Sequence, residues 1–141
     1  MNAATMDSPI SVVVGVDVVD IEQIGASIRN FGDRFLRRVY TQAEIDHCAG
    51  YVGQAGLERL ATRFAAKEAS VKALRPQGRW LDPRSIEVTV ASSGAPSLVF
   101  HGEAQALADR AGLASWSLSM SHEARTATAV VVALCHGVPQ P

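Results

Sequence analysis

Two carboxylates stand in the sequence where apolar side chains are expected, and they are the first candidates for chemistry. Asp17 lies in the valine-rich segment 12–19, on the same face of a predicted strand as Val13 and Val19. An isolated carboxylate on that face would lose its hydration, so it needs a compensating partner. Another interpretation is that Asp17 ends the strand and caps a helix that begins near Asp20.

Glu68 is the second misplaced carboxylate. A turn of about 100° per residue puts it between Phe64 and Val71, at the centre of the apolar stripe of a predicted helix. Lys72 follows four residues later and therefore lies beside Glu68 on the same helix surface. A self-contained salt bridge between Glu68 and Lys72 is one interpretation, and a functional carboxylate is the other.

Basic residues gather around Glu68 in the sequence. The segment 59–84 contains seven of the thirteen basic residues but only two acidic ones. Such a cluster can concentrate a phosphorylated ligand even in a nearly neutral protein, although a solvated basic helix face gives the same pattern. Carboxylate oxygens beside phosphate oxygens can complete a Mg²⁺ shell. The seven basic residues are Arg59, Arg63, Lys67, Lys72, Arg75, Arg79 and Arg84.

The remaining metal and nucleophile candidates are weaker. His122 ends a predicted strand, where a lone histidine is usually a turn residue, and no second histidine or cysteine stands at zinc-ligand spacing. Cys48 and Cys135 form no C-x-x-C pair, so we interpret them as reduced structural thiols of a cytoplasmic protein.

The bulk composition narrows the function classes. A chain of 141 residues with 48% hydrophobic residues fits one globular domain, and a net charge of −1 argues against a nucleic-acid-binding protein. The longest apolar stretches are too short to span a membrane. We predict a flexible leader over residues 1–11, a domain over 12–135 and a loose tail over 136–141, with no signal peptide.

The element pattern predicts an α+β fold with a largely antiparallel sheet packed against a long central helix. The first strand has apolar residues on both faces, so we expect it inside the sheet. A capping box at Thr41 and Glu44 marks a helix start. Strands are predicted at 12–19, 86–90, 97–100, 115–121 and 126–134, and helices at 20–30, 34–39, 41–49, 57–74 and 103–111.

Three motifs in a fixed order resemble those of a known family. They are Gly15-Val-Asp-Val-Val-Asp-Ile21, then Arg63-Phe-Ala-Ala-Lys-Glu-Ala-Ser-Val-Lys-Ala-Leu74, and finally Ser119-Met-Ser-His122 followed by a strand of small residues. The chain resembles the holo-acyl-carrier-protein synthases, the short single-copy type of 4'-phosphopantetheinyl transferase, from about Val13 to Ala133. The central helix matches the family motif almost residue for residue.

The resemblance implies a fold, an activity and a set of site residues. The expected reaction moves phosphopantetheine from coenzyme A to a serine of an apo-acyl-carrier protein in a homotrimeric enzyme, with Asp17 and Glu68 as Mg²⁺ ligands. Glu68 and Lys72 are the expected catalytic residues. The expected coenzyme A contacts are Arg63, Lys67, Lys72, Gly94, Pro96 and His122.

The expected carrier-docking surface departs from the family pattern. Gln23 stands where the family commonly has an arginine that pairs with acidic residues of the carrier. The nearest basic residues that can replace it in docking are Arg29, Arg34, Arg37 and Arg38.

Two other functions stay open at this point. A Mg²⁺-dependent hydrolase of coenzyme A or of a nucleotide pyrophosphate would use the same carboxylates with water as the nucleophile, although the glutamate-rich helix of a Nudix hydrolase is missing. A non-catalytic binding module would use the basic cluster to hold a nucleotide or an acidic protein.

Overall fold

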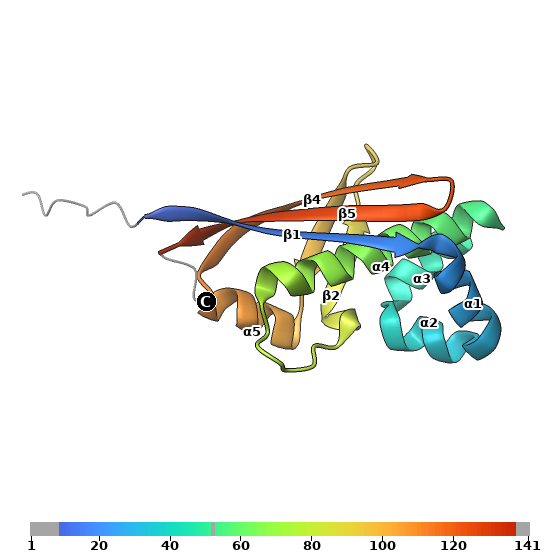
Figure 1. Cartoon of the computed structure of the whole chain (residues 1–141), viewed down its shortest axis with the longest axis horizontal. Helices are drawn as coiled ribbons and strands as arrows, with labels where there is room; N and C mark the ends of the chain where they lie inside the picture. Colours follow the sequence, from blue (N-terminus) through green and yellow to red (C-terminus); the bar gives the residue numbers. More distant parts are fainter. Residues whose placement is uncertain (1–8, 52, 138–141) are drawn as a thin grey trace, which may run out of the picture.

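A long helix packed along a three-stranded sheet organises the molecule (Figure 1). The computed structural model describes residues 9–51 and 53–137. Helix α4 (Gln54–Leu74) lies against antiparallel strands in the order β1–β5–β4. These strands are β1 (Ile10–Asp20), β4 (Leu113–Glu123) and β5 (Thr126–His136). The predicted α+β class is confirmed.

The contact between β1 and α4 is close enough to require a glycine. A Cβ atom on Gly15 would lie 1.9 Å from the carbonyl oxygen of Ala69 and 3.0 Å from the amide nitrogen of Ala73. The facing surface of α4 is correspondingly small, since Ala61, Ala65 and Ala69 are fully buried. This close packing brings the Asp17 end of β1 against the second half of α4.

The expectation that β1 lies inside the sheet is wrong. It is an edge strand that pairs only with β5, and only one of its faces meets α4. Val12, Val14, Val16 and Val18 on the other face are 48–63% exposed. Both faces are apolar as the sequence indicates, but one is uncovered in the single chain.

Three short helices connect β1 to α4: α1 (Ile21–Phe31), α2 (Asp33–Val39) and α3 (Gln42–Ala49). Figure 1 shows them grouped at one end of the molecule, and α5 at the other. The capping box is confirmed, because Thr41 Oγ1 accepts from the Glu44 amide and the Glu44 carboxylate accepts from the Thr41 amide at 2.8 Å.

A second, two-stranded sheet is the hairpin of β2 (Ile86–Val90) and β3 (Pro96–Phe100), both of which were predicted as strands. It is preceded by the 3₁₀ helix η1 (Pro83–Ser85), which the sequence pattern did not predict, and followed by α5 (Gly102–Arg110). None of the described helices is long and apolar enough to cross a membrane.

The predicted domain ends need correction. Ile10 and Ser11 belong to β1 and pair with His136 and Cys135, so the leader and the tail were each drawn too far into the sheet. Of the predicted leader, residues 1–8 lie outside the described residues, and so do residues 138–141 of the predicted tail.

Candidate active site

The first functional group lies where β1 crosses α4. Lys72 Nζ donates to Asp17 Oδ1 at 3.1 Å and to the Val16 carbonyl oxygen at 2.9 Å. The alternative role of Asp17 as a helix cap is excluded, because Asp20 caps α1 by accepting from the Glu22 amide. The partner that a half-buried Asp17 needs is therefore a lysine of α4.

Glu68 completes this group from α4. Burial of the carboxyl raises its pKa above the ordinary value, the nearby charge of Asp17 raises it further, and Lys72 opposes both. The salt bridge between Glu68 and Lys72 is not formed, since the ion pair of Lys72 is with Asp17. In the described part of the chain, no hydrogen bond or ion pair holds the Glu68 carboxylate.

Two neighbouring carboxylates, of which Asp17 has an ion pair and Glu68 has none, fit a divalent metal ion. No cluster of three or more acidic, histidine or cysteine side chains exists among the described residues. Mg²⁺ is commonly bound by one or two carboxylates together with phosphate oxygens of a substrate and water. Asp17 and Glu68 would supply the protein share of such a shell, and a cation there would neutralise the like charge that raises the pKa of Glu68.

Lys67 does not reach this group, which corrects its expected phosphate contact. Its side chain is only 2% exposed, and its three N–H donors go to Glu44 Oε1 at 2.8 Å and to the carbonyl oxygens of Pro83 at 3.0 Å and Ile86 at 2.5 Å. Burial lowers its pKa, and Glu44 opposes that shift. An ammonium with all its donors used inside the protein has none left for a phosphate.

The second functional group lines a cavity of about 430 Å³ between α4, the β2–β3 turn and the end of β4. Three of the expected coenzyme A residues, Arg63, Gly94 and His122, meet there, whereas Pro96 is not among the residues that line it. Gly94 has a φ of 89°, which favours glycine in this turn. His122 Nδ1 lies 3.6 Å from Glu58 Oε2.

Two arginines of this cavity have an unused buried donor. The Nε atoms of Arg59 and Arg63 are buried without a hydrogen-bond partner among the described residues, which is unusual for a native side chain unless a ligand or water completes the site. The guanidinium of Arg59 also lies 3.6 Å from the centre of the Tyr51 ring. Arg59 was predicted only as a member of the basic cluster, and Tyr51 was not predicted as a site residue. The i, i+4 spacing of Arg59 and Arg63 was the available signal.

The two groups are separate within one chain. Asp17, Glu68 and Lys72 do not line the cavity of Arg59 and Arg63. The expected docking arginines are exposed on α1 and α2, where Arg29 pairs with Glu22. Gln23 is exposed on α1.

Known proteins resemble this chain over most of its length. A family model described as the 4'-phosphopantetheinyl transferase superfamily matches residues 13–135. The holo-[acyl-carrier-protein] synthase of Koribacter versatilis is 43% identical over 122 residues, which cover 84% of this chain and 94% of that protein.

Solved structures agree with this match. An apo-ACPS structure from Chronobacterium ammoniagenes has a TM-score of 0.81 at 28% identity and covers 91% of this chain and 99% of its own. The Helicobacter pylori holo-[acyl-carrier-protein] synthase in complex with coenzyme A has a TM-score of 0.72 at 32% identity, covering 85% and 98%. The matched residues include both functional groups, so the chain belongs to the 4'-phosphopantetheinyl transferase superfamily.

Proposed function

We propose that the chain is a holo-[acyl-carrier-protein] synthase, which transfers 4'-phosphopantetheine from coenzyme A to a serine of an apo-acyl-carrier protein. The observation that carries this proposal is the meeting of Asp17 and Lys72 beside Glu68 at the crossing of β1 and α4. These residues belong to two of the motifs that are typical of the family. Relatives of this chain are named holo-[acyl-carrier-protein] synthase, which is the activity proposed.

The reaction is a phosphoryl transfer. The serine hydroxyl oxygen of the carrier forms a bond to the β-phosphorus of coenzyme A, and the bond from that phosphorus to the bridging oxygen breaks. 3',5'-Adenosine bisphosphate leaves with the electron pair. Glu68, directly or through a water molecule, accepts the serine proton, and Lys72 neutralises charge on the pyrophosphate.

Asp17 and Glu68 are the residues that would hold Mg²⁺. When bound, the ion supplies positive charge to the pyrophosphate oxygens. The residues fit this role because the charge of Asp17 lies close enough to raise the pKa of Glu68, while the cation Lys72 is ion-paired with Asp17.

Coenzyme A would place its adenosine phosphate in the cavity of Arg59 and Arg63. The two buried, unpartnered Nε donors and the nearby His122 are suited to a phosphate anion. The Helicobacter pylori relative was solved with coenzyme A, which supports the choice of ligand.

We further propose that the enzyme works as a homotrimer in the cytoplasm. The uncovered face of the sheet carries Val12, Val14, Val16 and Val18 together with Val132 and Leu134, a row of large apolar side chains that self-association would bury. The two functional groups do not meet within one chain, so a neighbouring copy can complete the site. Cys48 and Cys135 are both free, as expected in a reducing compartment.

Incubation with coenzyme A, Mg²⁺ and an apo-carrier protein, followed by intact-mass measurement, tests the proposed reaction. Transfer makes the carrier heavier by one phosphopantetheine. Release of free phosphopantetheine with an unchanged carrier would instead identify a hydrolase. Binding of coenzyme A with neither product would identify a binding module and overturn the proposal.

A further inference from the structure

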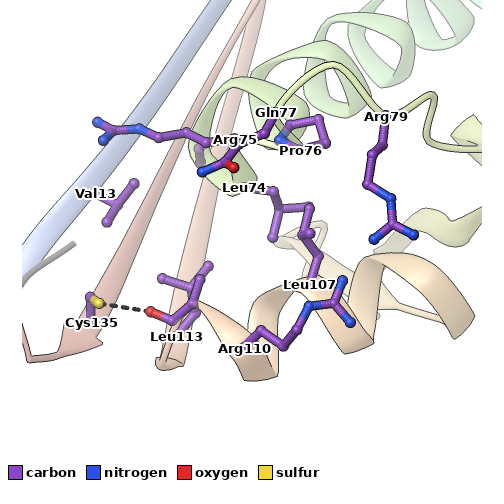
Figure 2. A pocket seen from close by; sticks show the side chains of 12 residues that line it. Val13, Leu74, Arg75, Pro76, Gln77, Arg79, Leu107, Arg110, Leu113 and Cys135 are labelled. Atoms are coloured by element: carbon purple, nitrogen blue, oxygen red, sulfur yellow. Dashed lines mark hydrogen bonds between the residues drawn. The ribbon is translucent and has the colours of Figure 1, made fainter. Parts of the chain in front are cut away.

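A separate cavity opens beside the last turn of α4, between β1, α5 and the start of β4 (Figure 2). Its volume is about 320 Å³, within the range of small-molecule pockets. The floor is apolar and includes Val13, Leu74, Leu107 and Leu113. None of the residues of the proposed reaction lines this cavity: Asp17, Glu68, Lys72, Arg59, Arg63 and His122 all lie outside it.

The rim of this cavity is cationic. Arg75, Arg79 and Arg110 line it, and no aspartate or glutamate among the described residues does. In the described part of the chain, none of these three guanidinium groups takes part in a hydrogen bond or an ion pair. Figure 2 shows the side chains of Arg79 and Arg110 extending from opposite walls toward the same opening. Like charges that converge without an acidic partner favour a bound anion between them.

The loop after α4 positions Arg79 at the rim of this cavity. Arg75 ends the helix in the left-handed region with a φ of 52°, and Gln77 follows at 53°, although neither residue is a glycine. Such backbone angles cost free energy in a residue with a side chain. The consequence is a tight turn that carries Arg79 back over the apolar floor, opposite the end of α5.

We propose that this cavity binds an anion with an apolar tail, of the fatty-acid carboxylate type. The carboxylate lies between Arg79 and Arg110, because guanidinium groups bind carboxylates through paired N–H donors. The tail lies on Leu74, Leu107 and Leu113, where it removes apolar surface from water. Neither a free phosphate nor a neutral lipid satisfies both parts of the cavity.

Isothermal titration of the full chain with decanoate, below its micelle concentration, tests this site. We expect saturable binding of one decanoate per chain, binding of decanol at least tenfold weaker, and no measurable heat from acetate. Equal affinity for decanoate and decanol, or binding of acetate alone, would overturn the proposal. Saturating coenzyme A is expected to leave decanoate binding unchanged, and displacement by coenzyme A would assign the binding to the proposed active site instead.

Substitutions locate the binding. The double variant Arg79→Gln/Arg110→Gln is expected to weaken decanoate binding at least tenfold, whereas the control Arg84→Gln, whose arginine pairs with Asp82, changes it less than twofold. A positive charge in the last turn of α5 also stabilises that helix, so thermal unfolding of each variant is measured. If the double variant is unfolded, Ala111→Leu narrows the cavity and keeps both charges. Full decanoate affinity in a folded variant of either kind would refute the assignment.

Discussion

At the scale of single residues, burial of the Glu68 carboxylate destabilises the fold, and the same carboxylate has a role in the proposed reaction. Its carboxylate is half-buried on a helix face that packs against a strand, and a second carboxylate, Asp17, lies close enough to raise its pKa. The single cation of the group, Lys72, is paired with Asp17. Residues that weaken a fold without local compensation are typical of functional sites.

Replacement of Glu68 by glutamine is therefore expected to separate activity from stability. Transfer should fall at least about a hundredfold, because charge stabilisation in the transition state is lost. The folded-state pKa of Glu68 is raised, so its stabilising contribution is present at acidic pH and is lost as the pH rises through that pKa. Thermal unfolding without Mg²⁺ should show Glu68→Gln as stable as, or more stable than, the parent chain at pH 7, and relatively less stable at pH 4.

The companion substitution Asp17→Asn tests the other predicted metal ligand. It should also reduce transfer at least about a hundredfold at saturating Mg²⁺. Near-normal turnover in either variant would remove that carboxylate from the ligand set. Loss of folding in both variants would mean that the pair is structural.

At the scale of elements, Gly15 sets how closely β1 approaches α4. A methyl group at this position would lie 1.9 Å from the Ala69 carbonyl oxygen, so the strand and the helix must move apart. We expect Gly15→Ala to reduce the free energy of unfolding by about 1–3 kcal/mol or more, as overpacking does. Gly50→Ala is the matched control, because Gly50 has an ordinary φ of −69° and its nearest atom to a new Cβ lies at 3.5 Å.

Urea unfolding of both glycine variants measures the difference, and transfer activity gives a second comparison. Since Gly15 positions Asp17 against Lys72 and Glu68, the alanine variant should lose activity even where it remains folded. Equal stability of the Gly15 and Gly50 variants would show that α4 shifts freely and that the close approach has no cost.

Lys67 joins three elements through its buried ammonium, linking α4 to α3 through Glu44 and to the η1–β2 segment through two carbonyl oxygens. Removal of one partner of a buried ion pair leaves the other charge unpaired, which costs about 3–5 kcal/mol. The Lys67→Ala variant should therefore unfold at a much lower denaturant concentration than the Lys72→Ala variant. The exposed ion pair that Lys72 forms with Asp17 contributes about 1 kcal/mol at most. A stable Lys67→Ala that bound coenzyme A weakly would restore the phosphate contact to Lys67.

The contrast between Lys67 and Lys72 shows what the sequence could predict about the site. Helical periodicity placed Glu68 and Lys72 on one surface, and strand alternation placed Asp17 on the face that meets α4. Periodicity could not show which basic residue turns inward, because Glu44 and the two carbonyl acceptors come from distant segments. Tyr51 was missed for the same reason, since its cavity is built by α4 together with the β2–β3 turn and β4, whereas the i, i+4 spacing of Arg59 and Arg63 was a signal in the sequence.

For the fold, too, the local elements were predicted but their long-range arrangement was not. Strong local patterns such as the capping box at Thr41 and the alanine-rich helix predicted their elements to within a few residues. The pairing of strands that are distant in the sequence, such as β1 with β5, was not predictable from one sequence. As a result, β1 was expected inside the sheet, because an apolar face that is covered within the chain and one that is left for another chain have the same composition.

At the scale of the whole molecule, that uncovered face predicts how the chain assembles. Val16 is 48% exposed in the middle of the row on β1. Val16→Lys would place a charge in the proposed interface, so we expect a monomer by light scattering and a large loss of transfer. Val99→Lys is the control, because Val99 is a 38% exposed valine on the separate two-stranded sheet. An unchanged oligomer in Val16→Lys would place the interface elsewhere.

The expected carrier-docking surface lies at the opposite end of the molecule from α5, where α1 and α2 present exposed arginines. Arg29 is already paired with Glu22, so Arg34, Arg37 and Arg38 remain to attract an acidic carrier. Exposed ion pairs are worth up to about 1 kcal/mol each, so Gln23→Arg should lower the carrier KM only a few-fold. The double reversal Arg34→Glu/Arg38→Glu should raise it much more, with an effect that shrinks at high salt and with the KM for coenzyme A unchanged as the internal control. If the carrier KM of the double variant matched that of the parent across an ionic-strength series, the carrier would have to dock on a surface other than α2.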